Sequence, residues 1–253
     1  MMHPSEYRKE GPAGEWVVSM KQLLPQEKDG MLFLVCYCGG LFHYQLDVDS
    51  LFAFHQSFPN ALHYLDCFWL LLPESTFEQQ LFWKCFYSLY SFTYLQMINR
   101  SHNTLCLAYF KSLIERNSAL PLEYKILDYG CGPGLAVEVF GSEHLVGYDN
   151  NPDMQIQAKK FGVSTLDAEN FHTMAPCSFD GGIACYVFHM AIPKKDIIRI
   201  AELLKTGGAF VANFYKGLGE REVTLAFQEA GFTFQKVDEM EGRFGCVYVY
   251  RKQ

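Results

Sequence analysis

The chain has 253 residues, of which 49% are hydrophobic and 19% charged, so it can bury a substantial core. Its formal net charge of −7, with no basic run, argues against an extended nucleic-acid interface, which needs clustered Lys and Arg. Nine cysteines lack the regular spacing of a secreted disulfide scaffold, and no signal-peptide pattern precedes them. Apolar runs such as Cys67–Leu72 are too short to span a membrane. A reduced, cytoplasmic location is therefore expected, with no membrane partner.

The N-terminal part begins with a polar, Gly-rich stretch over residues 1–14, where we expect a loose terminus. Short apolar segments follow at 16–20, 31–38 and 41–46. The last two are joined by Gly39-Gly40, and a Gly-Gly link between apolar runs is typical of a hairpin. These segments predict a small β-meander.

From residue 49 to about 117 the pattern becomes helical, beginning with a segment that Asn60 can cap and that ends before Pro73. Ser75 and Glu78 form a capping box ahead of an apolar run, which predicts a helix over 76–98. A further helix is expected over 104–116.

Aromatic residues crowd the predicted helix over 76–98, and two interpretations stay open. They pack between this N-terminal cap and the rest of the chain, or Tyr87, Tyr90 and Tyr94, which stand at helical spacing, line an apolar substrate pocket or lid.

The run Leu127-Asp128-Tyr129-Gly130-Cys131-Gly132-Pro133-Gly134 predicts the end of a strand, a tight loop and then a helix over 135–140. Glycine lets the backbone turn sharply and approach a ligand closely. The N-terminal amides of the following helix would face the same ligand. A nucleotide-like ligand is therefore expected over 128–134.

After the loop, short strands and helices alternate, as in a parallel sheet covered by helices on both faces. Strands are expected at 144–148, 163–166, 179–187 and 209–214, and helices at 152–161, at 193–205 and in a segment that ends at Gly231. The last two strands, 232–237 and 246–250, have no helix between them and predict an antiparallel hairpin at one edge of the sheet.

A dinucleotide site is one alternative for the loop. Its fingerprint needs Gly-x-Gly-x-x-Gly and an acid about 20 residues further on. Gly130, Gly132 and Asp149 fit this pattern, but Leu135 stands at the third glycine and Asp128 occupies a position that is usually apolar.

The loop instead resembles the glycine-rich motif of class I S-adenosylmethionine-dependent methyltransferases. Four later segments resemble further motifs of that family in the same order: Val146–Asp149, Asp167–Glu169, Ser178–His189 and Leu203–Gly208. The resemblance covers about residues 122–253. It implies a Rossmann-like, seven-stranded α/β sheet, preceded by the β-meander and helical cap, and S-adenosyl-L-methionine as cofactor.

The resemblance also implies a set of cofactor-binding residues. Asp128 would brace the loop or meet the cofactor's ammonium group, and Asp149 would accept two hydrogen bonds from the ribose hydroxyls. Asp167 and the Ala168 amide would contact adenine. The complete set expected to bind the cofactor is Asp128, Gly130, Cys131, Gly132, Gly134, Asp149, Asn150, Asp167, Ala168, Ala184 and Cys185.

Methyl transfer requires alignment of the acceptor, and a base only if the acceptor must lose a proton. His189, after the fourth strand, is the leading candidate for that base, although it could equally cap a turn. Tyr186 and Tyr90 are the other catalytic candidates. The aromatic rings of Tyr87, Tyr90 and Tyr94 could also flank the sulfonium.

Cys36-x-Cys38 weakly resembles half of the zinc-ribbon segment that precedes some bacterial methyltransferases acting on sugars. Residues 1–35 contain no cysteine to complete a four-ligand site, so no metal is predicted. A site made from Cys36, Cys38, His43 and Cys67 stays open as the alternative.

Together these features predict two domains. Residues 1–120 would form the cap, as substrate lid or dimerisation element, and 121–253 the methyltransferase domain. The expected function is methyl transfer to a small apolar, aromatic or sugar-linked acceptor, by an enzyme that could form a homodimer. The alternatives are a methyltransferase acting on RNA or protein and a non-catalytic binding module with the same fold.

Overall fold

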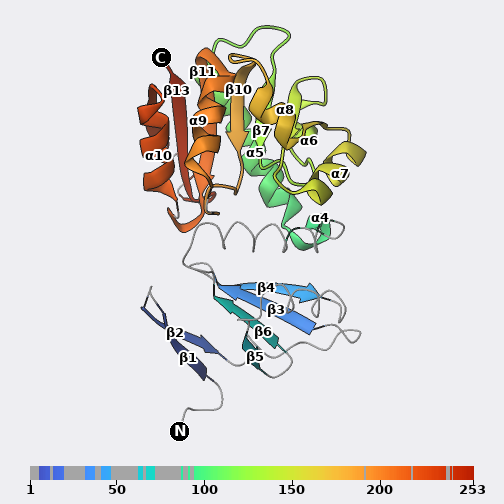
Figure 1. Ribbon diagram of the computed structural model, residues 1–253, viewed down its shortest axis with the longest axis vertical. Helices are drawn as coiled ribbons and strands as arrows, with labels where there is room; N and C mark the ends of the chain where they lie inside the picture. Colours follow the sequence, from blue (N-terminus) through green and yellow to red (C-terminus); the bar gives the residue numbers. More distant parts are fainter. Residues whose placement is uncertain are drawn as a thin grey trace. The chain divides into compact units, whose positions relative to one another are not determined.

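A computed structural model of the chain describes six N-terminal strands, residues 87 and 91, and residues 94–253 apart from 191, 218, 238, 239 and 241. The chain divides into two compact units, Met1–Pro73 and Glu74–Gln253, and each is described by itself (Figure 1).

The first unit contains a two-stranded ribbon and a four-stranded sheet. Its strands are β1 (Glu6–Gly11), β2 (Gly14–Ser19), β3 (Leu32–Tyr37), β4 (Leu41–Leu46), β5 (Leu62–Tyr64) and β6 (Cys67–Leu71). The sheet has the order β4-β3-β6-β5, and β1 pairs only with β2. β3 and β4 pair antiparallel on either side of Gly39-Gly40, as a hairpin requires.

Two expectations for the N-terminal part are wrong. The stretch 1–14 contains β1, which pairs in register with β2. The segment before Pro73 contains β5 and β6 where a helix was expected. The run Cys67–Leu71 is rich in aromatic and aliphatic residues, which suit a strand, and it pairs in parallel with β3.

The second unit alternates strands and helices (Figure 1). The strands are β7 (Ile126–Tyr129), β8 (Leu145–Tyr148), β9 (Ser164–Leu166), β10 (Phe179–Ala184), β11 (Leu204–Phe214), β12 (Phe232–Val237) and β13 (Cys246–Lys252). The helices are α4 (Tyr94–Met97), α5 (Arg100–Asn117), α6 (Val137–Phe140), α7 (Pro152–Lys160), α8 (Ala168–Thr173), α9 (Lys194–Leu203) and α10 (Glu220–Glu229).

These strands form one seven-stranded sheet with the order β12-β13-β11-β10-β7-β8-β9. β7 to β11 run parallel, whereas β13 is antiparallel to both β11 and β12. The predicted α/β class and the antiparallel strand pair at one sheet edge are therefore confirmed.

Helices cover both faces of the sheet and enclose two hydrophobic clusters. One cluster joins the sheet to α8, α9 and α10, and the other joins it to α5, α6 and α7. β13 contributes to both, because Tyr248 and Tyr250 belong to the first and Val247 and Val249 to the second.

The predicted helix over 104–116 is confirmed as α5, which begins four residues earlier because the Asn99 side chain accepts a hydrogen bond from the His102 amide. α5 contacts β10, β11 and β13 and so belongs structurally to the sheet unit. The structural division at Pro73 thus precedes residue 120. A separate role for residues 1–120 stays a prediction.

The strand order reverses at β7. The chain continues from β7 to β8 and β9 on one side, and returns to β10 and β11 on the other. Ligands of open α/β sheets bind beyond the carboxyl ends of the strands at such a point. This places the loop after β7 where a ligand is expected.

Candidate active site

The glycine loop follows β7 directly and requires glycine at two positions for different reasons. Gly130 has a φ of 73°, and a Cβ added there would lie 2.4 Å from Cγ2 of Val187. Gly132 has a φ of 51°, and nothing lies within 4 Å of where its Cβ would be. Gly130 therefore permits close packing, whereas Gly132 borders open space that a ligand can approach.

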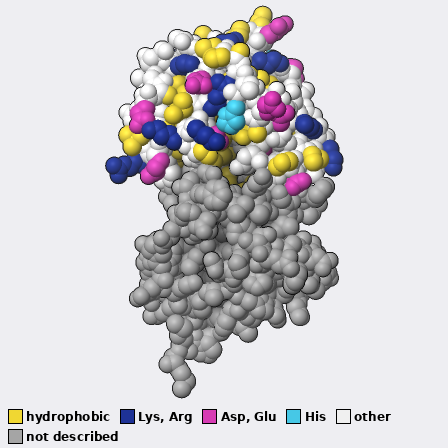
Figure 2. Space-filling model, viewed as in Figure 1, with side chains coloured by type: hydrophobic (Ala, Val, Ile, Leu, Met, Phe, Trp, Pro, Cys, Tyr) yellow, Lys and Arg dark blue, Asp and Glu magenta, His cyan; other side chains and the backbone are white. Residues whose placement is uncertain are grey.

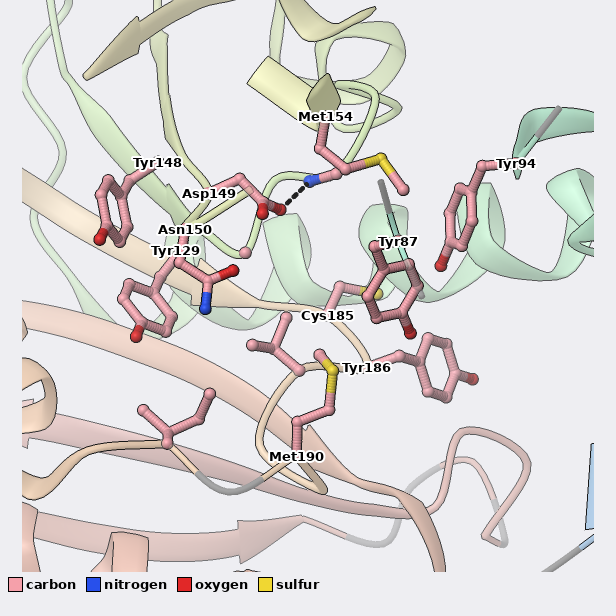
Figure 3. A pocket seen from close by; sticks show the side chains of 14 residues that line it. Tyr87, Tyr94, Tyr129, Tyr148, Asp149, Asn150, Met154, Cys185, Tyr186 and Met190 are labelled. Atoms are coloured by element: carbon pink, nitrogen blue, oxygen red, sulfur yellow. Dashed lines mark hydrogen bonds between the residues drawn. The ribbon is translucent and has the colours of Figure 1, made fainter. Parts of the chain in front are cut away.

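Asp149 follows β8 and connects that strand to the loop. Its Oδ2 accepts a hydrogen bond from the Gly132 amide at 2.9 Å (Figure 3), and its Oδ1 accepts one from the Asn151 amide at 2.9 Å. Burial raises the pKa of Asp149 to about 6, while these two amides act in the opposite direction. The carboxylate is therefore held in one orientation beside the loop.

Asp128 is the third residue of β7 and is only 3% exposed. Burial, and secondarily the nearby charge of Asp149, raise the pKa of Asp128 to about 7. A cation placed near the buried Asp128 carboxyl group would stabilise its ionised form.

Two adjoining cavities surround the loop and share Tyr94, Gly130, Gly132 and Cys185. The larger measures about 690 Å³ including its open mouth, and the smaller, which contains Asp128, about 410 Å³. We call Asp128, the glycine loop and Asp149 the donor side of this space.

Tyrosine side chains gather at the other end of the larger cavity, which we call the mouth. It is formed by Tyr87, Tyr94, Cys185, Tyr186 and Met190 (Figure 3). The rings of Tyr87 and Tyr94 meet edge to face, with centroids 5.6 Å apart. Burial, followed by Cys185 and Asp149, raises the pKa of Tyr94, so its phenol is neutral near pH 7.

The loop after β10 carries two residues of the mouth. The predicted strand over 179–187 ends at Ala184, because Tyr186 takes a left-handed backbone with φ 56°. Hydrogen bonding to Cys106, followed by burial, raises the pKa of Cys185 well above its usual range. This side chain is therefore a neutral thiol.

His189 lies in the same loop but lines neither cavity in the described part of the chain. Its ring contacts Tyr215 at 5.9 Å, and burial lowers its pKa to about 4. The imidazole is therefore neutral at pH 7 and a weak base. Its catalytic role stays a prediction.

The other predicted residues divide into two groups. Asn150 and Cys131 line the cavities, in addition to Asp128, Gly130, Gly132, Asp149 and Cys185. In the described structure Gly134, Asp167, Ala168 and Ala184 line neither of them. Asp167 instead caps α8 by accepting hydrogen bonds from the amide and the side chain of Asn170. Tyr90 lies outside the described residues.

The sequence did not single out several residues that line the larger cavity, namely Tyr129, Tyr148, Met154, Val187, Met190 and Ile192. Tyr129 and Tyr148 end β7 and β8, so their place at the carboxyl ends of neighbouring strands was the available signal. The remaining four sit in helices and loops and carry no such signal.

No described helix is long and apolar enough to cross a membrane. The described side chains also contain no cluster of three or more His, Cys, Asp or Glu that could hold a metal ion. The side chains of Cys36, Cys38, His43 and Cys67 lie outside that description.

Comparison with protein families matches residues 127–212 to a methyltransferase domain. This segment runs from β7 to β11 and includes the glycine loop, Asp149 and the loop after β10. No curated protein matches the chain.

Solved structures that resemble the chain include DesVI from Streptomyces venezuelae, with 13% identity, 61% of this chain and 93% of that chain covered, and a TM-score of 0.49. The amino pentose methyltransferase CalS10 from Micromonospora echinaspora shows 16% identity, 58% and 90% coverage, and a TM-score of 0.49. Magnesium protoporphyrin IX methyltransferase from Synechocystis shows 14% identity, 63% and 85% coverage, and a TM-score of 0.47.

These likenesses are weak, so the family match carries the assignment, together with the strand order and the site at the reversal point. The glycine loop, Asp149 and the buried Asp128 all lie at this reversal point, and their role in binding the cofactor stays a prediction. Residues 127–212 match a methyltransferase domain, and the protein is a methyltransferase that uses S-adenosylmethionine as its cofactor.

Proposed function

We propose that this enzyme transfers the methyl group of S-adenosylmethionine to a small molecule with an apolar, aromatic or sugar-linked skeleton. The observation that carries the proposal is the pair of adjoining cavities between the glycine loop and the tyrosine-lined mouth. A concave space lined mainly by aromatic and aliphatic side chains, with a few polar groups, is typical of a small-molecule site.

The donor side fits the cofactor on three grounds. The space beside Gly132 admits a close approach, the Asp149 carboxylate stands where ribose hydroxyls can donate to it, and Asp128 offers a buried acid to an ammonium group. When bound, the cofactor supplies an electrophilic methyl group. The protein's task is to hold it, orient the acceptor and exclude water.

The mouth supports an apolar or aromatic acceptor. Its tyrosines present ring faces and edges, and Cys185 and Met190 add polarizable sulfur atoms. Tyr87 and Tyr94 come from the region assigned to the cap by the sequence. Their place in the cavity supports a role for that region in acceptor binding.

Two measurements test this proposal. Calorimetry should detect binding of S-adenosylmethionine to the full chain, with competition by S-adenosylhomocysteine. Mass spectrometry of reactions with a metabolite library should then detect a product heavier by one methyl group that depends on the cofactor. If purified RNA or protein is methylated and no metabolite is, the assigned acceptor class is wrong. If the folded protein binds no cofactor, the enzymatic function itself is wrong.

We further propose a cytoplasmic location and a biosynthetic role. The described cysteines Cys106, Cys131, Cys177, Cys185 and Cys246 are all free thiols, as suits a reducing compartment. Subcellular fractionation of the native protein checks the location. A homodimer stays a prediction that light scattering can test.

A further inference from the structure

Tyr186 has an unusual backbone for its residue type. Its φ of 56° lies in the left-handed region, which costs a non-glycine residue about 1–2 kcal/mol. Such a conformation persists only where surrounding contacts hold it. Tyr186 stands at the mouth, directly after the central strand β10, so the strain lies in the wall of the active-site cavity.

Two contacts from distant segments hold Tyr186 in place. Its amide donates to Oδ1 of Asn213 at 2.7 Å, and Asn213 is fully buried and donates in turn to the Phe244 carbonyl at 2.8 Å. Its hydroxyl is 2.9 Å from Nε2 of His102, in the first turn of α5. The His102 ring also packs edge to face on Phe244.

The hydroxyl of Tyr186 therefore connects the cavity wall to an imidazole. His102 is only half-buried, so part of its ring faces solvent. Imidazole is the side chain that most readily takes up and releases protons near neutral pH. A phenol that remains neutral can relay a proton, and burial followed by the nearby thiols of Cys106 and Cys185 raises the pKa of Tyr186.

We propose that Tyr186, positioned by His102, receives the proton-bearing group of the acceptor, and that the acceptor is therefore a hydroxyl or amine compound that loses a proton on methylation. This inference rests on the proposed methyl transfer and narrows its acceptor class. Neither the family match nor the sequence motifs single out His102.

Methyl transfer and the accompanying proton transfer conserve atoms and charge. The acceptor's oxygen or nitrogen forms its new bond to the methyl carbon with a lone pair, while the carbon–sulfur bond breaks and leaves its electrons on sulfur. The acceptor's proton passes to Oη of Tyr186 as the Tyr186 proton passes to Nε2 of His102. The imidazolium then releases that proton to solvent.

Ionisation of a bound phenol tests the relay without requiring turnover. The probe is 4-nitrophenol, whose phenolate absorbs visible light, bound to the protein saturated with S-adenosylhomocysteine, which lacks the sulfonium charge. If His102 takes the proton, the bound probe's apparent pKa falls by at least about one unit, as expected for a phenolate near an imidazolium. The carboxylates of Asp128 and Asp149 act in the opposite direction, and no described Lys or Arg lines the cavities.

Two variants identify the groups responsible. His102→Gln keeps a hydrogen-bonding partner for Tyr186 but cannot take up a proton, so the probe's pKa should rise to its value in free solution or above it, because the carboxylates of Asp128 and Asp149 are then unopposed. Tyr186→Phe should give the same result. His144→Gln is the matched control, because His144 is stacked on Tyr124 and lines neither cavity. It should behave as wild type.

Affinity for S-adenosylhomocysteine tests the proposed methyl transfer, whereas the pKa of the bound probe tests the proton relay. Affinity for S-adenosylhomocysteine is measured first in every variant, and its absence in wild type would refute the methyltransferase proposal. Normal affinity with an unshifted probe, or a shift that survives in His102→Gln, overturns the relay alone. Failure of 4-nitrophenol to bind saturably also overturns it, because the mouth would then not admit a phenolic acceptor.

Discussion

The donor side and the mouth of the cavity are built in different ways. The donor side uses backbone conformation and two acids within one stretch of chain, from Asp128 to Asp149. The mouth uses side chains from two separate segments, 87–94 and 185–190, and Tyr186 depends on Asn213 and His102 for its position. The donor side is therefore specified locally, and the mouth by tertiary contacts.

This difference matches the roles proposed for the two ends. One donor serves a whole enzyme class, so a short local motif is sufficient to bind it. Acceptors differ between enzymes, and side chains on separate elements can change one at a time without disturbing the loop. Variants at the two ends should therefore fail in different ways.

The largest effect is expected for Gly130→Ala. The new Cβ would combine left-handed strain with a 2.4 Å approach to Val187, so stability should fall by about 3 kcal/mol. Gly132→Ala is the control, since it has a similar φ but open space, and it should lose about 1 kcal/mol. Urea unfolding measures both. Equal losses would show that packing against Val187 is not what requires glycine at position 130.

Asn213→Ala should cause the next largest loss, and it acts on the mouth. It leaves the Tyr186 amide and the Phe244 carbonyl without their partner, at a cost of about 2–3 kcal/mol in unfolding free energy. Cofactor affinity, measured by calorimetry in the folded variant, should stay within about twofold. Asn117→Ala, which removes a single bond to a carbonyl in a half-exposed position, should cost less than about 1 kcal/mol. A loss of donor binding in Asn213→Ala would contradict the separation of the two ends.

Asp149→Ala should weaken S-adenosylmethionine binding by about 1–2 kcal/mol, or about tenfold, since a charged hydrogen-bonding partner is lost. Asp153→Ala, in the first turn of α7, is the matched control and should stay within about twofold. Isothermal calorimetry measures both. An unchanged affinity in Asp149→Ala would show that Asp149 does not contribute to cofactor binding.

Asp128 should make stability depend on pH, with the smallest expected effect. Its folded pKa of about 7 lies above the ordinary value of 3.8, so the folded protein holds this proton more tightly than the unfolded chain does. Stability from this group is therefore present at low pH and is lost as pH rises from about 4 to about 7. Relative to wild type, Asp128→Asn should gain about 1–2 kcal/mol between pH 6 and pH 8 in the absence of cofactor.

Repeating the comparison of wild type with Asp128→Asn in saturating S-adenosylmethionine tests whether the cofactor's ammonium group lies near Asp128. A cofactor ammonium group near Asp128 favours the carboxylate, so cofactor should stabilise wild type more than Asp128→Asn at pH 8. Thermal unfolding with and without cofactor, at both pH values, gives the four stabilities needed. Identical cofactor stabilisation in the two proteins would place the ammonium group elsewhere.

The sequence predicted the position of the glycine loop and of Asp149 in the fold, because these signals are local; their role in binding the cofactor stays a prediction. Glycines after an acid, and a second acid at the end of the next strand, indicated the loop and Asp149. The same reasoning found the edge strand pair, since two strands followed each other without a helix.

The mouth could be predicted only in part. Tyr87 and Tyr94 were found through helical spacing, but the early end of β10 at Ala184 was missed, because the strain at Tyr186 depends on Asn213, far along the chain. The pairing of His102 with Tyr186 has no sequence signal for the same reason. Likewise, β5 and β6 were taken for a helix because their strand state depends on pairing with β3.

β13 has a further consequence for how the second unit opens. It lies between β11 and β12, and its alternating side chains belong to both hydrophobic clusters. Withdrawing this one strand would expose both faces of the sheet at once. Amide hydrogens of Val247–Tyr250 should therefore exchange with deuterium only through global unfolding. They give a direct measure of the stability of the whole unit, whereas the amides around Tyr186 report on local opening at the mouth.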